Sequence, residues 1–297
     1  MVKIIIIIVI VLLILAAAFV WWLPSFVLTG KRQTLEEAFA WQSERYDTGF
    51  YEKLEKETYT IEGYEGYTLH AEFLKNPEPT TKYMILTHGY TDNRRGSLKY
   101  VPMYLDLGFN CITYDLRGHG ENEPTFSTCG IREAEDLRFV IADSRKRFLD
   151  MTMLGLHGES LGAATTVTVM KYKPEVDFAV ADCGFSDIEN VLRGLYRNAH
   201  LPEGIVDVAD FGAKIRYHYS LKEMRPIDSL DDNTVPILFI HGADDNFILP
   251  KNSEDMAKRT KGMSEVYLIP GAEHAVSILT DKDSYQKCVS GFLSKLQ

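Results

Sequence analysis

The sequence carries no excess of positive charge, no internal repeat and no low-complexity tract. Its formal net charge is -10, whereas nucleic-acid-binding proteins gather Lys and Arg on one face, so we expect no nucleic acid partner. With 45% hydrophobic and 25% charged residues, the composition is that of a folded globular chain rather than a disordered one. Its 297 residues are enough for one large domain.

Cysteine is scarce, at four residues, and the four lie far apart in the chain. They form no C-x-x-C pair, and no histidine stands at metal-ligand spacing near them, which excludes the common zinc patterns. Cys111 and Cys183 lie in apolar runs, where a thiol behaves as a small hydrophobic group. We therefore expect buried free thiols, and a disulfide that includes Cys129 is the alternative if the domain lies outside the cell.

One long apolar run stands at the N-terminus. Residues 4–20 hold no charged side chain, and Trp21 and Trp22 follow. A helix of this length reaches about 25 Å, and the next apolar residues extend it to the thickness of a hydrocarbon core. The pattern predicts a single-pass membrane anchor over residues 1–29, with the Trp pair at the headgroup boundary.

A cleaved secretory signal is the alternative to an anchor. Residues 16–18 read Ala-Ala-Ala and offer an A-x-A cleavage site. The apolar run is longer than the usual signal core of about 7 to 15 residues, which favours an uncleaved anchor. Lys3 on one side faces Lys31 and Arg32 on the other, so the positive-inside rule gives no clear bias. We expect the rest of the chain on the extracytoplasmic side.

Beyond the anchor, strand-like runs alternate with helical patterns. Residues 30–64 are polar and rich in helix formers, and Glu37 follows a Thr34 N-cap by three residues, so we expect a helical lead-in there. Strands are predicted over seven runs: 67–74, 83–86, 110–114, 151–156, 178–181, 236–240 and 266–269. This alternation predicts an α/β domain over residues 30–297, with a mostly parallel sheet covered by helices.

Residues 188–230 break the alternation. They carry helical patterns with aromatic and basic residues, no clear strand, and punctuation by Pro202 and Pro226. An ordinary crossover connection is shorter than this interval. We therefore expect a small helical cap inserted between two strands of the sheet.

A G-x-S-x-G motif occupies residues 158–162. It follows the predicted strand at 151–156 and precedes an Ala- and Thr-rich helical stretch, which is the context of a nucleophile elbow. Small residues are needed on both sides of the serine because the strand and the helix lie close to the turn. The motif predicts Ser160 as a nucleophile near the positive end of a helix dipole.

A serine hydroxyl needs a base to accept its proton and an acid to orient that base, in the chain order serine, acid, histidine. Asp244 and Asp245 follow the strand at 236–240, and His274 follows the next strand. Because the carboxyl ends of parallel strands share one edge of the sheet, these loops are predicted to meet the serine.

Other histidines fit this role less well. His88 and His241 each end a strand within a His-Gly pair, and we expect both to bond local backbone.

The oxyanion of an acyl intermediate needs two N–H donors, one after the nucleophile and one from the loop after an earlier strand. Leu161 and Tyr90 are the predicted donors, since Gly89 lets the second loop approach closely.

Five motifs together resemble the α/β-hydrolase family. They are His-Gly-Tyr at 88–90, Asp-Leu-Arg-Gly-His-Gly at 115–120, Gly-Glu-Ser-Leu-Gly at 158–162, His-Gly-Ala-Asp-Asp at 241–245 and Gly-Ala-Glu-His at 271–274. More narrowly, the chain is similar to bacterial membrane-anchored serine hydrolases of the serine aminopeptidase and lysophospholipase-like branch. In that family the acid usually stands four residues after the histidine of the His-Gly pair, which selects Asp245 over Asp244.

The motifs and the resemblance imply a serine hydrolase with an acyl-enzyme mechanism and the triad Ser160, Asp245 and His274. It would need no metal or organic cofactor. We expect a small carboxylic ester as substrate, because an alcohol leaves more easily than an amine. A short peptide or amide, acyl transfer to another acceptor, and a non-catalytic membrane-tethered binding protein are the alternatives. The apolar cap side chains predicted to line an acyl pocket are Leu192, Leu195, Tyr196 and Phe211.

Overall fold

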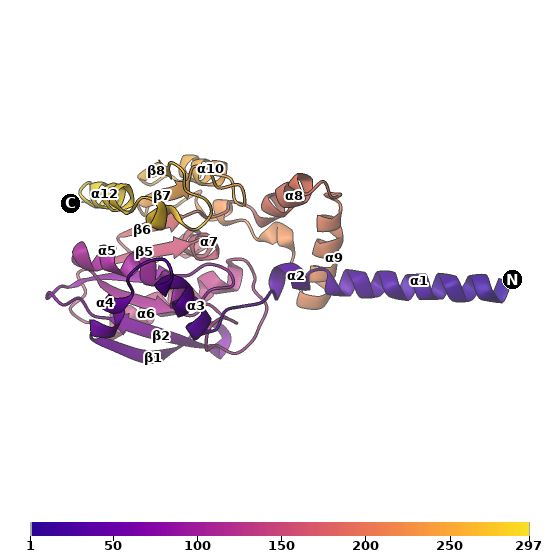
Figure 1. The fold of residues 1–297 in the computed structure, drawn as a ribbon, viewed down its shortest axis with the longest axis horizontal. Coiled ribbons are helices and arrows are strands. Elements are labelled where there is room, and N and C mark those ends of the chain that lie inside the picture. The colour runs from indigo at the N-terminus through magenta and orange to yellow at the C-terminus, as the bar shows by residue number, and fades with distance from the viewer. Residues whose placement is uncertain (1, 297) are drawn as a thin grey trace.

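A central sheet of eight strands organises the computed structural model, which describes residues 2–296 (Figure 1). Their order is β1-β2-β4-β3-β5-β6-β7-β8. The pairs β1·β2 and β2·β4 are antiparallel and the other neighbours are parallel. The strands are β1 (Lys56–Glu62), β2 (Thr68–Leu74), β3 (Lys82–Thr87), β4 (Asn110–Tyr114), β5 (Met153–Glu159), β6 (Phe178–Asp182), β7 (Ile237–Gly242) and β8 (Ser264–Ile269). The predicted α/β fold with a mostly parallel sheet is confirmed.

Helices cover both faces of this sheet. The α-helices of the described residues, including those that lie away from the sheet, are α1 (Val2–Trp22), α2 (Ser25–Leu28), α3 (Leu35–Ser43), α4 (Gly49–Lys53), α5 (Val101–Asp106), α6 (Ile131–Arg147), α7 (Leu161–Thr168), α8 (Ile188–Asn198), α9 (Ile205–Tyr217), α10 (Lys251–Arg259), α11 (Ser277–Thr280) and α12 (Lys282–Leu293). Short 3-10 helices lie between them: η1 (Tyr64–Gly66), η2 (Gly96–Tyr100), η3 (Val169–Tyr172), η4 (Leu221–Glu223) and η5 (Pro226–Ser229).

Alternate strand residues feed two separate cores. In β3, Ile85 packs with α6 and α7 on one face, whereas Met84 and Leu86 pack with α5 and α12 on the other. Successive side chains of a strand point to opposite faces, so a strand covered on both sides is apolar at consecutive positions. This is why the buried strands were readable from the sequence.

The predicted helical lead-in is wrong in its last part, because residues 56–62 form the edge strand β1. Its earlier part is helical, and α3 begins at the predicted cap: Glu37 N donates to Thr34 Oγ1, and Thr34 N donates to the Glu37 carboxylate. Only Ile61 of β1 is buried. An edge strand with one buried side chain lacks the apolar pattern that identifies strands.

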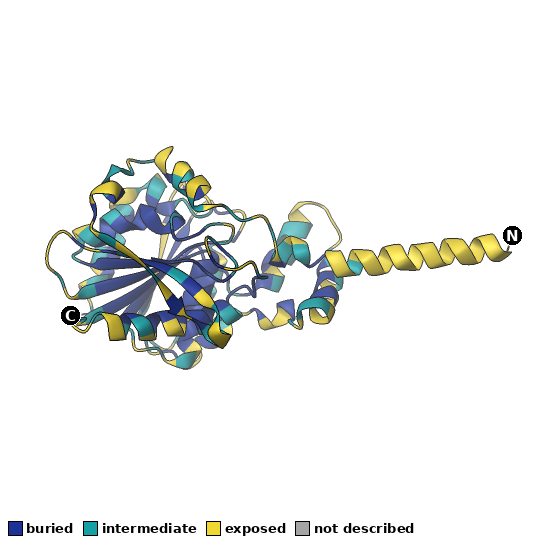
Figure 2. Cartoon of the chain, turned by 90° about the horizontal axis from the view of Figure 1, so that it is seen from below, coloured by how far each residue is buried: buried dark blue, intermediate teal, exposed yellow. Residues whose placement is uncertain are grey.

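Helix α1 projects away from the sheet and buries none of its residues (Figures 1 and 2). The apolar stretch Val2–Leu28 contains an 18-residue window with mean hydropathy 3.5. By length and composition it is able to cross a membrane. The last part of this apolar stretch, after α1, is different: Leu23 and Leu28 are buried against the domain. Packing therefore joins the apolar segment to the domain well before residue 29.

Helices α8 and α9 lie between β6 and β7, within the interval predicted as a cap. Asp187 caps α8 by accepting from Asn190 N. Helix α9 packs against the end of α1.

All four cysteines are free; Cys111, Cys129 and Cys183 are buried and Cys288 is partly buried.

The segment after β4 ties loops together through buried ion pairs. Arg94 binds Asp115 through its guanidinium and its backbone N–H. Arg117 donates twice to Asp136, at 2.7 Å each, and both side chains are at most 3% exposed. Asp136 also accepts from Tyr64 N at 2.9 Å. The Asp-Leu-Arg-Gly-His-Gly motif therefore has a structural role here.

Removal of the Arg117 guanidinium leaves the Asp136 charge buried without its ion-pair partner. We expect Arg117→Ala to lower the free energy of unfolding by roughly 3–5 kcal/mol, measured by chemical denaturation of the detergent-solubilised protein. The control is Arg138→Ala, which breaks an exposed pair with Glu135 and is expected to cost less than about 1 kcal/mol. Equal small losses in both variants would contradict this role for the buried pair.

Candidate active site

Ser160 lies in a sharp turn between β5 and α7. Its φ of 53° and ψ of -112° are strained for a non-glycine residue. A Cβ on Gly158 would collide with the carbonyl of Gly162, and a Cβ on Gly162 would collide with the carbonyl of Thr87. Both glycines of the motif are therefore required for β3, β5 and α7 to approach one another. The Ser160 side chain stands at the N-terminus of α7.

The structure brings the three predicted site residues into one hydrogen-bonded chain. Ser160 Oγ lies 3.0 Å from His274 Nε2, and His274 Nδ1 lies 2.7 Å from Asp245 Oδ2. Ser160 is 9% exposed and Asp245 is 1% exposed, whereas Asp244 is exposed to solvent. Asp245 is thus the acid of the pair that meets the histidine.

Asp245 is held as a carboxylate. Burial raises the pKa of Asp245, but the hydrogen bonds from His241 and His274 together lower it by more than burial raises it. The pKa therefore lies below its ordinary value. Its other oxygen accepts from the N–H groups of Phe247 and Ile248, each at 2.9 Å. An ionised carboxylate only accepts hydrogen bonds, so His274 carries its proton on Nδ1 and donates it to Asp245, which leaves Nε2 free to accept a proton from Ser160.

His88 bonds local backbone, as expected, whereas His241 bonds backbone and also contacts the side chains of Ser253 and Asp245. Leu116 N donates to His88 Nε2 at 2.9 Å, and burial lowers the pKa of His88 to about 4. His241 Nε2 lies 2.7 Å from the Ile248 carbonyl. Both rings therefore fix loops near the site rather than face a cavity.

The two predicted oxyanion donors lie beside Ser160 and have free N–H groups. A Cβ on Gly89 would lie 3.6 Å from Ser160 Cβ, so the loop that carries Tyr90 touches the serine. Neither Tyr90 N nor Leu161 N donates a hydrogen bond to any residue in the range 2–296. Free N–H groups next to a nucleophile are suited to bind an oxyanion.

Two cavities meet at Ser160, and they differ in chemistry. An apolar cavity of about 190 Å³ lies between the serine and helices α2 and α8. A second cavity of about 250 Å³ has polar walls that include Asp92, Lys99 and Glu159. The serine therefore has an apolar side and a charged side.

The apolar cavity corrects part of the predicted acyl pocket. Leu192 and Leu195 line it as predicted, but Tyr196 and Phe211 do not, and Phe211 is 58% exposed on α9. Amphipathic periodicity shows that a helix has an apolar face, but it does not show which element that face contacts. Sequence reasoning missed further walls: Phe26, Val27, Cys129, Phe185, Ile188, Val191, Phe247 and Ile248. Phe26 and Val27 had been assigned to the anchor because they continue its apolar run.

A buried ionic cluster contacts the loop that carries His274. Lys99 Nζ pairs with Glu159 and donates to the Ala275 carbonyl at 2.7 Å, next to His274. Tyr100 bonds both Glu159 and Asp182, and burial raises the pKa of Asp182 to about 6. The cluster therefore connects Glu159, which precedes Ser160, to Ala275, which follows His274. No sequence motif marked Lys99, since its partners come from distant segments.

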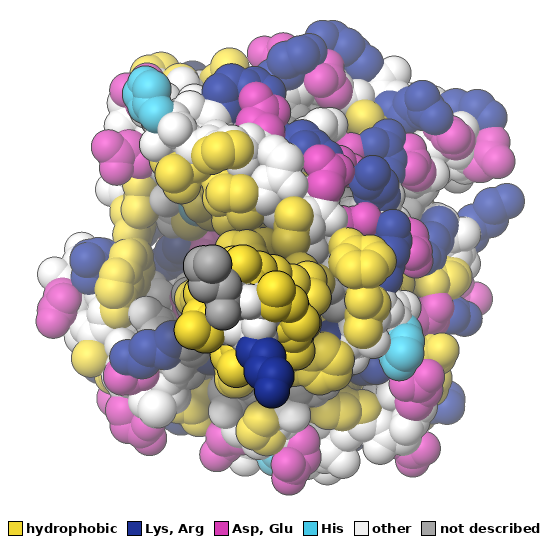
Figure 3. Space-filling model, turned by 90° about the vertical axis from the view of Figure 1, so that its right-hand side faces the viewer, with side chains coloured by type: hydrophobic (Ala, Val, Ile, Leu, Met, Phe, Trp, Pro, Cys, Tyr) yellow, Lys and Arg dark blue, Asp and Glu magenta, His cyan; other side chains and the backbone are white. Residues whose placement is uncertain are grey.

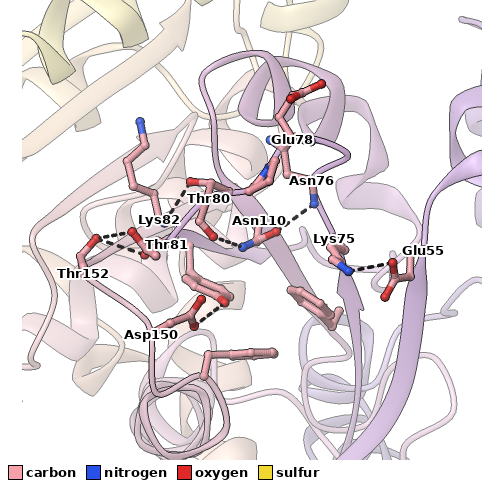
Figure 4. A pocket seen from close by; sticks show the side chains of 14 residues that line it. Glu55, Lys75, Asn76, Glu78, Thr80, Thr81, Lys82, Asn110, Asp150 and Thr152 are labelled. Atoms are coloured by element: carbon pink, nitrogen blue, oxygen red, sulfur yellow. Dashed lines mark hydrogen bonds and ion pairs between the residues drawn. The ribbon is translucent and has the colours of Figure 1, made fainter.

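A much larger cavity, of about 780 Å³, lies at the opposite edge of the sheet (Figure 4). It is lined where β3 and β4 begin, whereas Ser160 follows the end of β5. Its polar side chains bond one another, as in the pair Tyr83 and Asp150 at 2.9 Å. It lies away from the serine and holds none of the predicted site residues.

Comparisons with known proteins give the same fold. Residues 96–296 match the prolyl oligopeptidase family. The uncharacterized protein YqkD of Bacillus subtilis (strain 168) is 32% identical over 252 residues, which cover 83% of this chain and 82% of that protein.

Solved structures also resemble this chain. An esterase from Pyrococcus furiosus has a TM-score of 0.68 at 21% identity, covering 84% of this chain and 96% of that one. A Butyrivibrio proteoclasticus protein with ferulic acid bound has a TM-score of 0.62 at 18% identity, covering 80% and 98%. Together they confirm the predicted α/β-hydrolase fold.

The polar cavity gives a pH-dependent prediction for stability. Burial, with a smaller effect of Glu159, raises the pKa of Asp92 to about 7. The folded protein then holds this proton more tightly than the unfolded chain, so wild-type stability falls as pH rises from about 4 to 7. The amide in Asp92→Asn does not titrate, so we expect the free energy of unfolding of this variant to increase relative to that of wild type as the pH rises from about 4 to 7. Chemical denaturation curves at several pH values measure this difference. A stability difference that stays constant with pH would contradict the assignment.

Proposed function

The chain belongs to the prolyl oligopeptidase family and is a serine hydrolase with the α/β-hydrolase fold, and we propose that it hydrolyses carboxylic esters through Ser160, His274 and Asp245. The observation that carries this proposal is the 3.0 Å contact between Ser160 Oγ and His274 Nε2. A base at that distance is within reach of the hydroxyl proton. The family alone does not choose between ester and peptide bonds.

In the proposed mechanism, Ser160 Oγ attacks the acyl carbonyl while its proton passes to His274 Nε2. Asp245 holds the Nδ1 proton and stabilises the imidazolium. The N–H groups of Tyr90 and Leu161 receive the charge that develops on the carbonyl oxygen. The alcohol leaves with the proton from Nε2. Water then attacks the acyl-enzyme by the same steps in reverse and releases the acid.

The walls of the two cavities support an ester with an apolar acyl group. The apolar cavity beside Ser160 suits a hydrocarbon chain, because its walls come almost entirely from hydrophobic side chains. The alcohol side then falls in the polar cavity. A peptide is the second candidate, since Asp92 and Glu159 line that polar cavity and carboxylates suit a peptide amino group. Lys99 already pairs with Glu159, which weakens that reading.

We further propose that α1 anchors the domain to a membrane as a single spanning helix. Its length and apolar composition support this, and Trp21 and Trp22 at its end suit the headgroup boundary. No metal or organic cofactor enters the proposed reaction.

Labelling by a fluorophosphonate probe tests the nucleophile. We expect wild type to be labelled at Ser160, located by mass spectrometry, and to turn over short-chain aryl esters but not aminoacyl amides. Ser160→Ala should lose labelling and at least about 10,000-fold in kcat, while Ser294→Ala, an exposed serine on the far side, should match wild type. Absent labelling of folded wild type would favour a non-catalytic binding protein. Turnover of aminoacyl amides alone would favour the peptidase.

The adjacent aspartates provide a matched test of the acid. Asp245→Asn is expected to lower kcat by roughly 10,000-fold, because an amide no longer holds the productive histidine tautomer. Asp244→Asn makes the same chemical change at the neighbouring exposed carboxylate, and it should leave kcat within about twofold of wild type. Ester hydrolysis rates with thermal unfolding curves for both variants decide the matter. Similar losses in the two variants would rule out a specific role for Asp245.

A further inference from the structure

The end of α1 packs directly against the domain. A Cβ on Gly212 would collide with the carbonyl of Val20, so this glycine allows α9 to pack directly on α1. Arg216 donates to the Trp21 carbonyl at 3.1 Å and to Ser25 Oγ at 2.6 Å. Because these contacts join α1 to the domain, a bilayer that holds α1 would meet the face of the domain from which the helix projects.

That face is apolar around the base of α1. Figure 3 looks along α1 and shows hydrophobic side chains gathered around the helix. Phe211 and Ile215, one turn apart on α9, are 58% and 48% exposed, and Phe26 on α2 is 80% exposed. Soluble surfaces rarely gather large apolar side chains in this way. We call Phe26, Phe211 and Ile215 the anchor-side patch.

The apolar cavity reaches the same face. Phe26 belongs both to the anchor-side patch and to the cavity wall, and Val27 beside it also lines the cavity. Ser160 lines the same cavity. A volume of about 190 Å³ is that of roughly six water molecules, enough for a short length of hydrocarbon. A longer chain bound at Ser160 would extend past α2 toward the bilayer.

We propose that the anchor-side patch rests in the lipid surface and that single-chain acyl esters enter the cavity from the bilayer past Phe26. This inference rests on the proposed ester hydrolysis. It also rests on the proposed membrane anchor: the patch adjoins the base of α1, so a bilayer that α1 spans would lie against it, and lipid is therefore its occupant. The acyl chain then passes from one apolar environment into another and avoids exposure to water.

The test compares two substrates of one chemistry with the full-length protein in phosphatidylcholine and phosphatidylglycerol vesicles. One is octanoyl glycerol, which is presented from water, and the other is palmitoyl glycerol, which is embedded in the vesicles. The variant Phe211→Asp/Ile215→Asp places charge on the patch without touching the cavity walls. We expect it to hydrolyse the embedded ester at least about tenfold more slowly, because charge opposes burial in the interface.

Hydrolysis of octanoyl glycerol by the same variant should stay within about twofold of wild type, which also reports that the variant is folded. The control Leu149→Asp changes an apolar residue that is 90% exposed on the loop after α6 and should alter neither rate. Equal rates on the embedded ester for wild type and the patch variant would overturn the inference. Absence of octanoyl glycerol hydrolysis by wild type would instead overturn the proposed ester hydrolysis.

Discussion

The conformation of Ser160 depends on two close backbone approaches that only glycine permits. Its left-handed backbone costs on the order of 1–3 kcal/mol, and the surrounding elements hold it there. Ser160 N donates to the Asp182 carbonyl at 2.8 Å, and the Ser160 carbonyl accepts from Ala164 N at 2.9 Å. With Gly162 against Thr87, α7 begins directly above β3. The serine oxygen therefore stands between a helix N-terminus and the Gly89 loop.

A buried layer of charge lies under this arrangement. Lys99, Glu159 and Asp182 come from three distant segments, and Tyr100 and Tyr285 hydroxyls share the Asp182 carboxylate. Charges removed from water are stable only when each finds partners, so the layer tolerates few displacements. Its contacts connect the ends of β5 and β6 to the turn at Ala275. The histidine loop thereby gains a fixed support that the surface alone would not provide.

The loops that carry the candidate triad were predictable from the sequence because parallel strands end at one edge of the sheet. Ser160, Asp245 and His274 each follow a strand that was recognisable by its apolar run, so their meeting followed from topology. Strand β1 was missed because an edge strand needs only one buried side chain. Phe26 and Val27 were missed as cavity walls for a different reason: apolarity alone does not distinguish contact with lipid from contact with protein. Lys99 was missed because its role depends on segments far apart in the chain.

The four cysteines of this chain are free thiols in the structure. Burial raises the pKa of Cys129 and of Cys288 to about 12, and it also raises the pKa of Cys111 and Cys183. Oxidation and thiol exchange proceed through the thiolate, which these surroundings disfavour. The chain therefore folds in this structure without a disulfide among its four cysteines. The fold draws its stability from packing and buried ion pairs rather than from cross-links between cysteines.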